Sequence, residues 1–163
     1  MASYQLIETI TVGSGGAASI SFSSIPQTFT DLVVMSSTRS ASTGNQLIPS
    51  VNGSTATSTR NLFGDGGSAL GTTAVTWIGF GTASGDTASV FGNSYFYFPN
   101  YALTQAKFSS SHSCNETNGA SSYITVVGGY WSSTTAISTL SFATNSGNFA
   151  QHSSMSLYGI KSS

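Results

Sequence analysis

Two histidines and a single cysteine are the side chains of this sequence best suited to bind a transition metal. His112 and Cys114 are two positions apart, but the other histidine, His152, is far along the chain. A tetrahedral site needs three or four ligands. The alternative is a histidine at a strand end beside a buried thiol, and we therefore predict no metal site.

Two aspartates lie in glycine-rich segments where they could act together. A pair of carboxylates on either side of a cleft is the arrangement with which glycosidases cleave sugars, and Asp65 and Asp86 could converge in this way. Aspartates in such segments more commonly form turns by accepting backbone hydrogen bonds. We prefer the interpretation that these aspartates form turns, in which Asp65 could also pair with Arg60.

Nucleophilic catalysis and phosphate binding lack their sequence patterns. Serine is abundant, but no Gly-x-Ser-x-Gly nucleophile elbow accompanies either histidine. The Gly-Ser-Gly-Gly segment at 13–16 follows a predicted strand, yet no helix follows it to supply a phosphate cradle. We predict that the protein is not an enzyme and has no catalytic residue and no cofactor.

The charge of the chain is low and evenly spread. Charged residues make up 6% of the sequence, the net charge is −1, and the few basic residues form no run. The electrostatic attraction that drives nucleic-acid binding is therefore missing. A weakly charged surface is poor at keeping molecules apart, which favours a protein that works in an assembled state.

The sequence carries no sign of export or of membrane insertion. Its single cysteine excludes an internal disulfide framework. The first residues have no basic end followed by an apolar segment, and no apolar run reaches eighteen residues. We expect synthesis in a cytoplasm and no membrane partner.

Aromatic residues supply the strongest structural pattern, at 91–101. A period of two places Phe96 and Phe98 on one face and Tyr95 and Tyr97 on the other, and Pro99 ends the strand. The phenylalanine face should be dry, whereas tyrosine rings suit a half-exposed face or an interface. An oligomer seam or a sugar-stacking surface would use such rings, and the predicted interface residues are Trp77, Phe80, Phe91, Tyr95, Tyr97 and Tyr101.

Alternating apolar residues predict strands along most of the chain. Residues 4–12 and 18–23 are predicted to form a hairpin around the glycine-rich turn at 13–16, although Glu8 falls on the apolar side of the first strand and Ile7 on the polar side. Residues 31–39 resemble a central strand. Pro49 confines the strand at 46–51 to a sheet edge.

The second half continues this pattern after a polar segment. Residues 54–73 are predicted to be a long surface loop, with one short strand around 60–63. Further strands are expected at 74–80, at 105–111 with Ala106 and Phe108 inward, at 122–131, at 136–142 and at 152–160. In the strand at 122–131, Gly128 and Gly129 indicate a bulge or a close backbone approach.

These strands define the fold class. With about ten strands and no segment of helical period, we predict an all-β protein, a single-domain antiparallel β-sandwich that is jelly-roll-like with little or no helix. At 163 residues the chain should form one domain over residues 1–163.

Several segments resemble small virion proteins of tailed phages that infect cyanobacteria and other aquatic bacteria. The likeness covers residues 2–34 and the ending at 146–149 and 156–161, with Val-Asn-Gly-Ser at 51–54 and Phe-Pro-Asn-Tyr at 98–101 between them. These motifs are turns and strands without a chemically reactive residue.

The resemblance implies a jelly-roll protein of phage particles, and it implies a virion role more firmly than a location on the virion. We expect a location on the outer surface, with the six aromatic residues named above contacting other copies or the capsid. The resemblance favours a capsid decoration (cement) protein that binds the major capsid protein or another virion protein as a homotrimer and stabilises the shell. The seam would include Tyr95 or Trp77. The alternative is a receptor-binding or glycan-binding tip of a tail or head fibre. Neither role requires nucleic acid, metal or cofactor.

Overall fold

The computed structural model describes residues 3–73, 76–118 and 122–161 of the chain, and all its regular elements are β-strands. No helix in these residues is long and apolar enough to cross a membrane. The strands are β1 (Ser3–Thr11), β2 (Ser19–Phe22), β3 (Asp31–Thr38), β4 (Gln46–Val51), β5 (Ser54–Thr55), β6 (Ser58–Gly64), β7 (Ala69–Thr73), β8 (Gly79–Phe80), β9 (Gly92–Phe98), β10 (Lys107–Cys114), β11 (Ile124–Trp131), β12 (Leu140–Thr144) and β13 (Ser154–Lys161).

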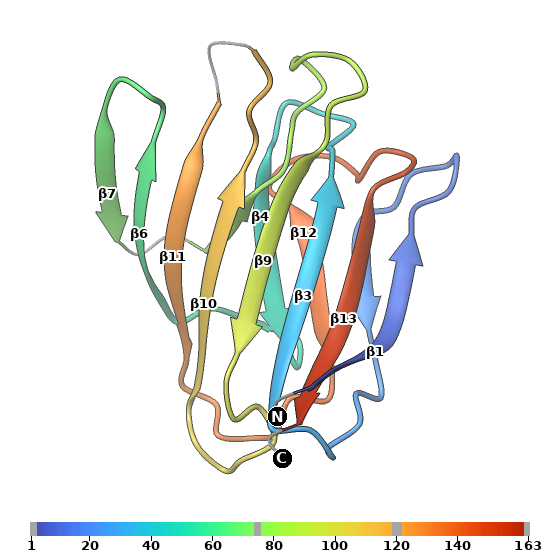
Figure 1. Ribbon diagram of the computed structural model, residues 1–163, viewed down its shortest axis with the longest axis vertical. Coiled ribbons are helices and arrows are strands. Elements are labelled where there is room, and N and C mark those ends of the chain that lie inside the picture. Colours follow the sequence, from blue (N-terminus) through green and yellow to red (C-terminus); the bar gives the residue numbers. More distant parts are fainter. Residues whose placement is uncertain (1–2, 74–75, 119–121, 162–163) are drawn as a thin grey trace.

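Two antiparallel sheets of unequal width form a sandwich. The larger has eight strands in the order β1-β13-β3-β9-β10-β11-β6-β7, and the smaller has the order β2-β12-β4-β5, with β8 also paired to β4. Figure 1 shows the large sheet in front and the strands of the small sheet behind its right-hand part. The predicted β-sandwich is confirmed.

The strand order follows the jelly-roll pattern. When β1, β2, β3, β4, β8, β9, β12 and β13 are counted in sequence, one sheet holds the first, last, third and sixth, and the other holds the second, seventh, fourth and fifth. Chain segments thus alternate between the two sheets, as in a double Greek key. The four remaining long strands, β10, β11, β6 and β7, widen the large sheet beyond the small one (Figure 1).

Apolar side chains from both sheets fill the space between them. On β9, Phe96 and Phe98 are fully buried, whereas Tyr95 and Tyr97 are partly exposed on the outer side. β9 ends at Phe98, directly before Pro99, as predicted. On β11, Val127 and Trp131 are buried, which confirms the predicted alternation. The fully buried rings and branched side chains include Phe22, Leu32, Val34, Phe96, Phe98, Leu140, Phe142 and Leu157.

The inner face of β10 carries small hydroxyl side chains where a core strand usually carries large apolar ones. The backbone of residues 78–80 packs against them. Ser111 donates a hydrogen bond to the carbonyl oxygen of Ile78, the Phe80 N–H donates to Ser113 Oγ (3.0 Å), and Ser94 Oγ on β9 donates to the Phe80 carbonyl oxygen (3.0 Å). These hydroxyl groups satisfy backbone groups that the short strand β8 leaves unpaired.

The orientation predicted for residues 105–111 was therefore wrong. Phe108 points outward and is 49% exposed, whereas Lys107 points inward and is 1% exposed. Lys107 Nζ donates to the carbonyl oxygens of Leu103 (2.6 Å), Gln105 (2.5 Å) and Thr134 (3.3 Å). These bonds explain why Lys107 points inward. They connect the loop before β10, which contains Leu103 and Gln105, with the loop after β11, which contains Thr134. Burial also lowers the pKa of this ammonium group.

Close packing explains one of the paired glycines on β11. A Cβ atom at Gly129 would lie 2.9 Å from Ser109 Oγ and 3.1 Å from the Trp131 ring. The predicted close approach is thus present at Gly129.

The predicted hairpin between residues 4–12 and 18–23 does not form. β1 pairs with β13 in the large sheet, while β2 pairs with β12 in the small sheet. The glycine-rich turn therefore carries the chain from one sheet to the other. Alternation shows which side of a strand is buried, but it does not identify the neighbouring strand.

A register shift between Leu6 and Glu8 explains the irregular pattern of β1. Such a bulge reverses the side to which the following residues point. Ile7 and Ile10 accordingly pack against the core, and Leu6 is 53% exposed. The pattern read from the sequence, with Glu8 on the apolar side and Ile7 on the polar side, did not anticipate this shift.

Residues 54–73, predicted as a surface loop, contain β5, β6 and β7. On β6, two of the residues that point inward are Thr59 and Asn61, which are polar but buried. Because these polar side chains replace apolar ones, the strand gave no clear alternation. Of the strand predicted at 74–80, residues 74 and 75 lie outside the described residues, and only β8 is present in the rest.

Pro49 lies where one side of β4 has no strand partner. β8 pairs with residues 46 and 47, and β5 pairs with residues 50 and 51, so the proline faces the gap between them. β4 also pairs with β12 along its other side, so the predicted edge position of this strand was wrong. The proline is tolerated inside the sheet because it has no partner in β8 or β5.

We expect the Ser111→Ala substitution to lower the free energy of unfolding by about 1–2 kcal/mol, because it leaves the buried Ile78 carbonyl oxygen without its donor. Urea denaturation followed by fluorescence would measure the loss. Ser110→Ala is the matched control, since Ser110 is exposed on the opposite face of the same strand, and should change stability by less than about 0.5 kcal/mol. Equal effects of the two substitutions would contradict the role given to Ser111.

Candidate functional site

The outward-facing residues of β13, β3, β9, β10, β11 and β6 form a broad surface, which we call the front face. The register places Leu62, Val126, His112, Tyr95, Met35 and Ser156 in one row across these strands. A second row consists of Arg60, Gly128, Ser110, Tyr97, Val33 and Tyr158. Arg60, at one margin, is the only lysine, arginine, aspartate or glutamate in these two rows.

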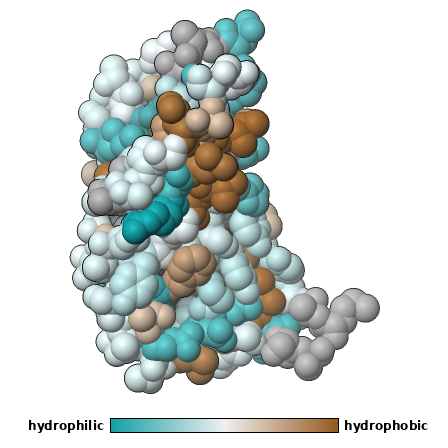
Figure 2. Space-filling model, turned by 90° about the vertical axis from the view of Figure 1, so that its left-hand side faces the viewer, coloured by the Kyte–Doolittle hydropathy of each residue, from teal (hydrophilic) through white to brown (hydrophobic). Residues whose placement is uncertain are grey.

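Large apolar side chains are exposed on one half of the front face. Ile124 is 66% exposed, Val126 58% and Leu62 57%, and Phe108 and Tyr130 are exposed beside them. Figure 2 shows apolar residues gathered on the side of the molecule where β6, β7 and β11 lie. Contiguous exposed apolar surface on a soluble protein commonly marks an interaction site.

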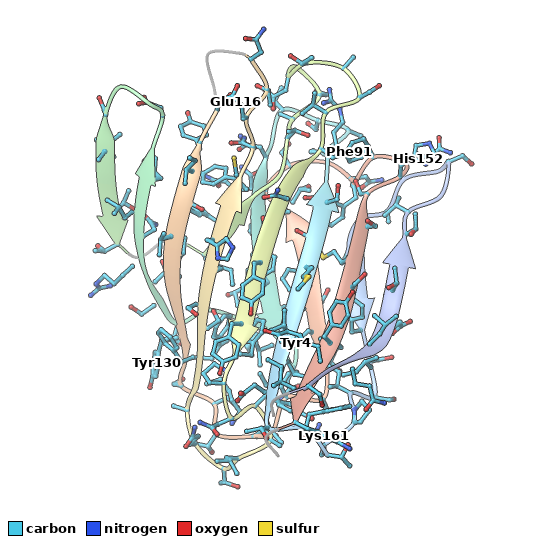
Figure 3. All side chains as sticks on the ribbon, in the orientation of Figure 1. Tyr4, Phe91, Glu116, Tyr130, His152 and Lys161 are labelled. Atoms are coloured by element: carbon cyan, nitrogen blue, oxygen red, sulfur yellow. The ribbon has the colours of Figure 1, made fainter. Side chains whose placement is uncertain are left out.

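Tyrosine rings occupy the other half. The hydroxyl groups of Tyr4 and Tyr95 are 3.4 Å apart, and the Tyr95 ring stacks on His112 with centroids 5.0 Å apart. Tyr4 also contacts Tyr158 edge to face, with centroids 6.4 Å apart. Tyr4 and Tyr130 lie in the lower half of this face (Figure 3). These rings give the face a rigid surface with hydroxyl groups at its centre.

Asp31 fixes the position of Tyr97 at the lower end of the face. Tyr97 donates a hydrogen bond to Asp31 Oδ2 (3.0 Å), and Asp31 Oδ1 accepts one from the Asn100 N–H (2.8 Å). Burial raises the pKa of the Tyr97 hydroxyl, and the carboxylate beside it raises this pKa further. For Tyr95, burial and then the hydrogen bond with Tyr4 raise the pKa.

The six predicted contact residues fall into two groups. Tyr95 and Tyr97 lie on the front face, and Phe91 is half-buried at the upper end of β9 (Figure 3). Trp77, Phe80 and Tyr101 are instead 7%, 5% and 0% exposed. They belong to the interior of this chain and are therefore not available to a partner as surface anchors.

Sequence reasoning missed the aliphatic part of the front face. Ile124 and Val126 alternate with buried residues on β11, and an apolar residue on both sides of a strand is usually a sign of a central, doubly covered strand. On β11 the outer side is open. The exposed position of Phe108 could have been found only by recognising that Lys107 points inward.

The residues considered for chemistry do not form a site together. His112 is exposed on the front face, and Cys114 is half-buried on the same strand. His152 lies in the turn before β13, at the side of the large sheet opposite to β6 and β7 (Figure 3). Residues 3–73, 76–118 and 122–161 contain no group of three His, Cys, Asp or Glu side chains that could hold a metal ion.

Each of the two aspartates stabilises its own turn. Asp65 Oδ1 accepts hydrogen bonds from the N–H groups of Gly67 (2.9 Å) and Ser68 (2.7 Å), and these bonds lower the pKa of its carboxyl group. Asp86 Oδ2 accepts one from the Ala83 N–H (2.7 Å). Arg60 donates to Ser58 and to the Thr59 carbonyl oxygen, so the predicted pairing with Asp65 is absent.

A scan against protein-family models found no match, and searches of curated proteins and of solved structures found none either.

The raised pKa values of Tyr97 and Tyr101 predict a loss of stability at high pH. Burial is the main cause for both residues. An unfolded tyrosine titrates near pH 10, so above that pH the unfolded chain releases protons that the folded chain retains. The contribution of these two hydroxyl groups to the free energy of unfolding is fully present below about pH 10. It is lost as the pH rises through their pKa values in the folded protein.

Urea unfolding between pH 8 and pH 11 would test this expectation. Tyr97→Phe should reduce the dependence of the unfolding free energy on pH in the alkaline range. Ser110→Ala, which alters the neighbour of Tyr97 in the register without removing an ionisable group, should leave the dependence as in the wild type. A Tyr97→Phe variant with the wild-type pH dependence would show that this hydroxyl has no such role.

Proposed function

We propose that this protein is a structural protein of a phage particle, a capsid decoration (cement) protein that binds the outer shell as an oligomer and stabilises it. The observation that carries the proposal is the front face, which is broad, apolar and almost without charge. The jelly-roll strand order and the resemblance of residues 2–34 and 156–161 to small virion proteins support it.

The front face has the size that a stable protein interface needs. Six strands spaced about 4.8 Å apart, each contributing about seven residues that rise about 3.4 Å, cover about 700 Å². A standard interface buries about 800 Å² on each partner. The side chains of Ile124, Val126, Leu62 and Tyr95 supply the aliphatic and aromatic surface that is buried in the centre of such interfaces.

The low charge of the face suits a mechanical role. Burying apolar surface gives a favourable free energy of about 25 cal/mol per Å² before the costs of association, and this attraction needs no complementary charges on the partner. A decoration protein held in this way would resist the outward pressure of packaged DNA by joining neighbouring subunits of the shell. The proposed partners are further copies, as a homotrimer, and the major capsid protein.

No catalytic step is part of this proposal. Tyr95 remains the proposed seam residue, because it lies near the middle of the row between Leu62 and Ser156. Trp77, the other seam residue expected from the sequence, is buried in its own chain and is not included.

Val126→Asp is expected to weaken self-association at least tenfold, because it places an unpaired charge on the apolar half of the front face, which the proposed interface would bury. Analytical ultracentrifugation at micromolar concentration would measure the change. Leu103→Asp is the matched control, since Leu103 is also exposed (54%) but lies in the loop between β9 and β10. A wild-type protein that sediments as a monomer at this concentration would refute the proposed oligomer.

Particles that lack this protein should lose their DNA at lower temperature than complete particles. Adding the wild-type protein should restore heat resistance, and adding the Val126→Asp variant should not. A dye that reports released DNA during heating would measure both, and a map of the particle would show whether the protein covers the shell. Unchanged heat resistance without the protein would refute the cement function.

A further inference from the structure

A cleft of about 630 Å³ lies where the large sheet extends beyond the small one. The inner sides of β6 and β7 contribute Phe63 and Thr72, and Tyr123 lies directly before β11. The segment 77–86 and the residues before and at the start of β4 form the remaining walls. Its volume is within the range of about 300–1,000 Å³ that is usual for small-molecule sites.

Four aromatic rings form one continuous wall of the cleft. Phe80 stacks on Tyr123 with centroids 5.2 Å apart, and Trp77 contacts Phe80 at 4.8 Å. Phe63 meets both Trp77 (6.4 Å) and Tyr123 (6.0 Å) edge to face. Trp77 and Phe80 are buried beneath, while Phe63 and Tyr123 are half-exposed. The half-exposed rings can therefore contact a ligand while the buried ones hold them in place.

Polar side chains face the same cleft. Asn45 and Gln46 line it, and their side chains make no hydrogen bond with the described residues. Asp86 contributes a carboxylate, of which Oδ2 is bonded to the Ala83 N–H. Thr43 and Thr72 add hydroxyl groups. The cleft thus offers both donors and acceptors beside an apolar wall, and its lining contains one acidic side chain and no lysine or arginine.

The loop that carries Asp86 is held in place by Arg39. The guanidinium group donates to the carbonyl oxygens of Ser84 (3.1 Å) and Asp86 (3.1 Å) through Nη2. Through Nη1 it donates to those of Thr87 (2.9 Å) and Val90 (3.1 Å). Four bonds from one planar group fix the course of the loop before any ligand binds, which lowers the entropic cost of binding.

We propose that this cleft binds a neutral pyranose saccharide. A pyranose ring has an apolar C–H face, which suits the rings of Phe63 and Tyr123, and hydroxyl groups around its edge, which suit the amides of Asn45 and Gln46. The Asp86 carboxylate would accept hydrogen bonds from sugar hydroxyl groups and repel the carboxylate of sugar acids. The proposal does not depend on the virion function, because the cleft is formed by different residues from those of the front face.

Saturation-transfer-difference NMR would test the proposal with four probes: the methyl glycosides of glucose, galactose, mannose and N-acetylglucosamine. At least one should receive saturation on its ring C–H protons, and the methyl glycoside of glucuronic acid should receive none. Absence of transfer to all four neutral probes would refute the proposal. Transfer to the sugar acid equal to that of the neutral probes would refute the role given to Asp86 and with it the stated ligand class.

Variants would place the bound sugar in the cleft. Gln46→Ala should weaken binding about three- to tenfold through the loss of hydrogen bonds. Gln5→Ala, at an exposed position of the edge strand β1, is the matched control and should bind as the wild type does. Binding that Gln46→Ala and Asp86→Asn both leave unchanged would refute the location.

Fluorescence supplies a second readout. The sequence contains two tryptophans, of which Trp77 lines the cleft, and Trp131 is buried with its Nε1 bonded to the Ser54 carbonyl oxygen (3.0 Å). A bound sugar should change the emission of the wild type, and Trp77→Phe should remove this change. Sedimentation of the same samples is a separate measurement, so failure of sugar binding is distinguishable from failure of the proposed oligomer.

Discussion

The contact between residues 78–80 and the serines of β9 and β10 determines how the two sheets meet in the wide half of the molecule. Here backbone, and not a layer of large side chains, approaches a sheet directly. A Cβ atom at Gly79 would lie only 3.0 Å from the Phe96 ring. The Ile78 N–H also donates to the Leu47 carbonyl oxygen (3.0 Å), which links this segment to β4. Because buried backbone groups must be paired, the hydroxyl groups of Ser94, Ser111 and Ser113 are required for this packing.

This contact also determines which side chains are exposed on the outer side of the large sheet. Serines fill the inner side of β10, so its largest ring, Phe108, points away from the core. Beyond β10 the small sheet ends, and in the part of the chain that the structure describes no strand lies behind β6 and β7 (Figure 1). The inner side of this extension forms the aromatic cleft, and its outer side carries the exposed aliphatic residues of β11 and β6. One difference in sheet width therefore produces both surfaces for which we propose a function.

Much of the fold could be predicted from the sequence, and the reasons for the failures are physical. The phenylalanine side of β9 was correctly predicted to be buried, whereas for β11 the strand was predicted without its buried side. Strands with polar inner residues were not predicted correctly: Thr59 and Asn61 concealed β6, and the serines of β10 reversed the expected orientation of Phe108. Alternation also contains no information about strand partners, which is why β1 and β2 were wrongly paired. Of the predicted contact residues, the tyrosines of β9 lie on the surface, because a strand pattern distinguishes its two faces. Trp77, Phe80 and Tyr101 lie outside long strands, so their burial depends on tertiary packing that no local pattern records.

Two positively charged side chains, Lys107 and Arg39, are held by hydrogen bonds to backbone carbonyl oxygens and not by carboxylates. Lys107 and Arg39 together donate to seven such oxygens. Dissolved ions screen the attraction between opposite charges more strongly than they weaken a hydrogen bond to a neutral carbonyl group. These seven hydrogen bonds should consequently depend less on ionic strength than salt bridges would, in dilute and in concentrated salt alike.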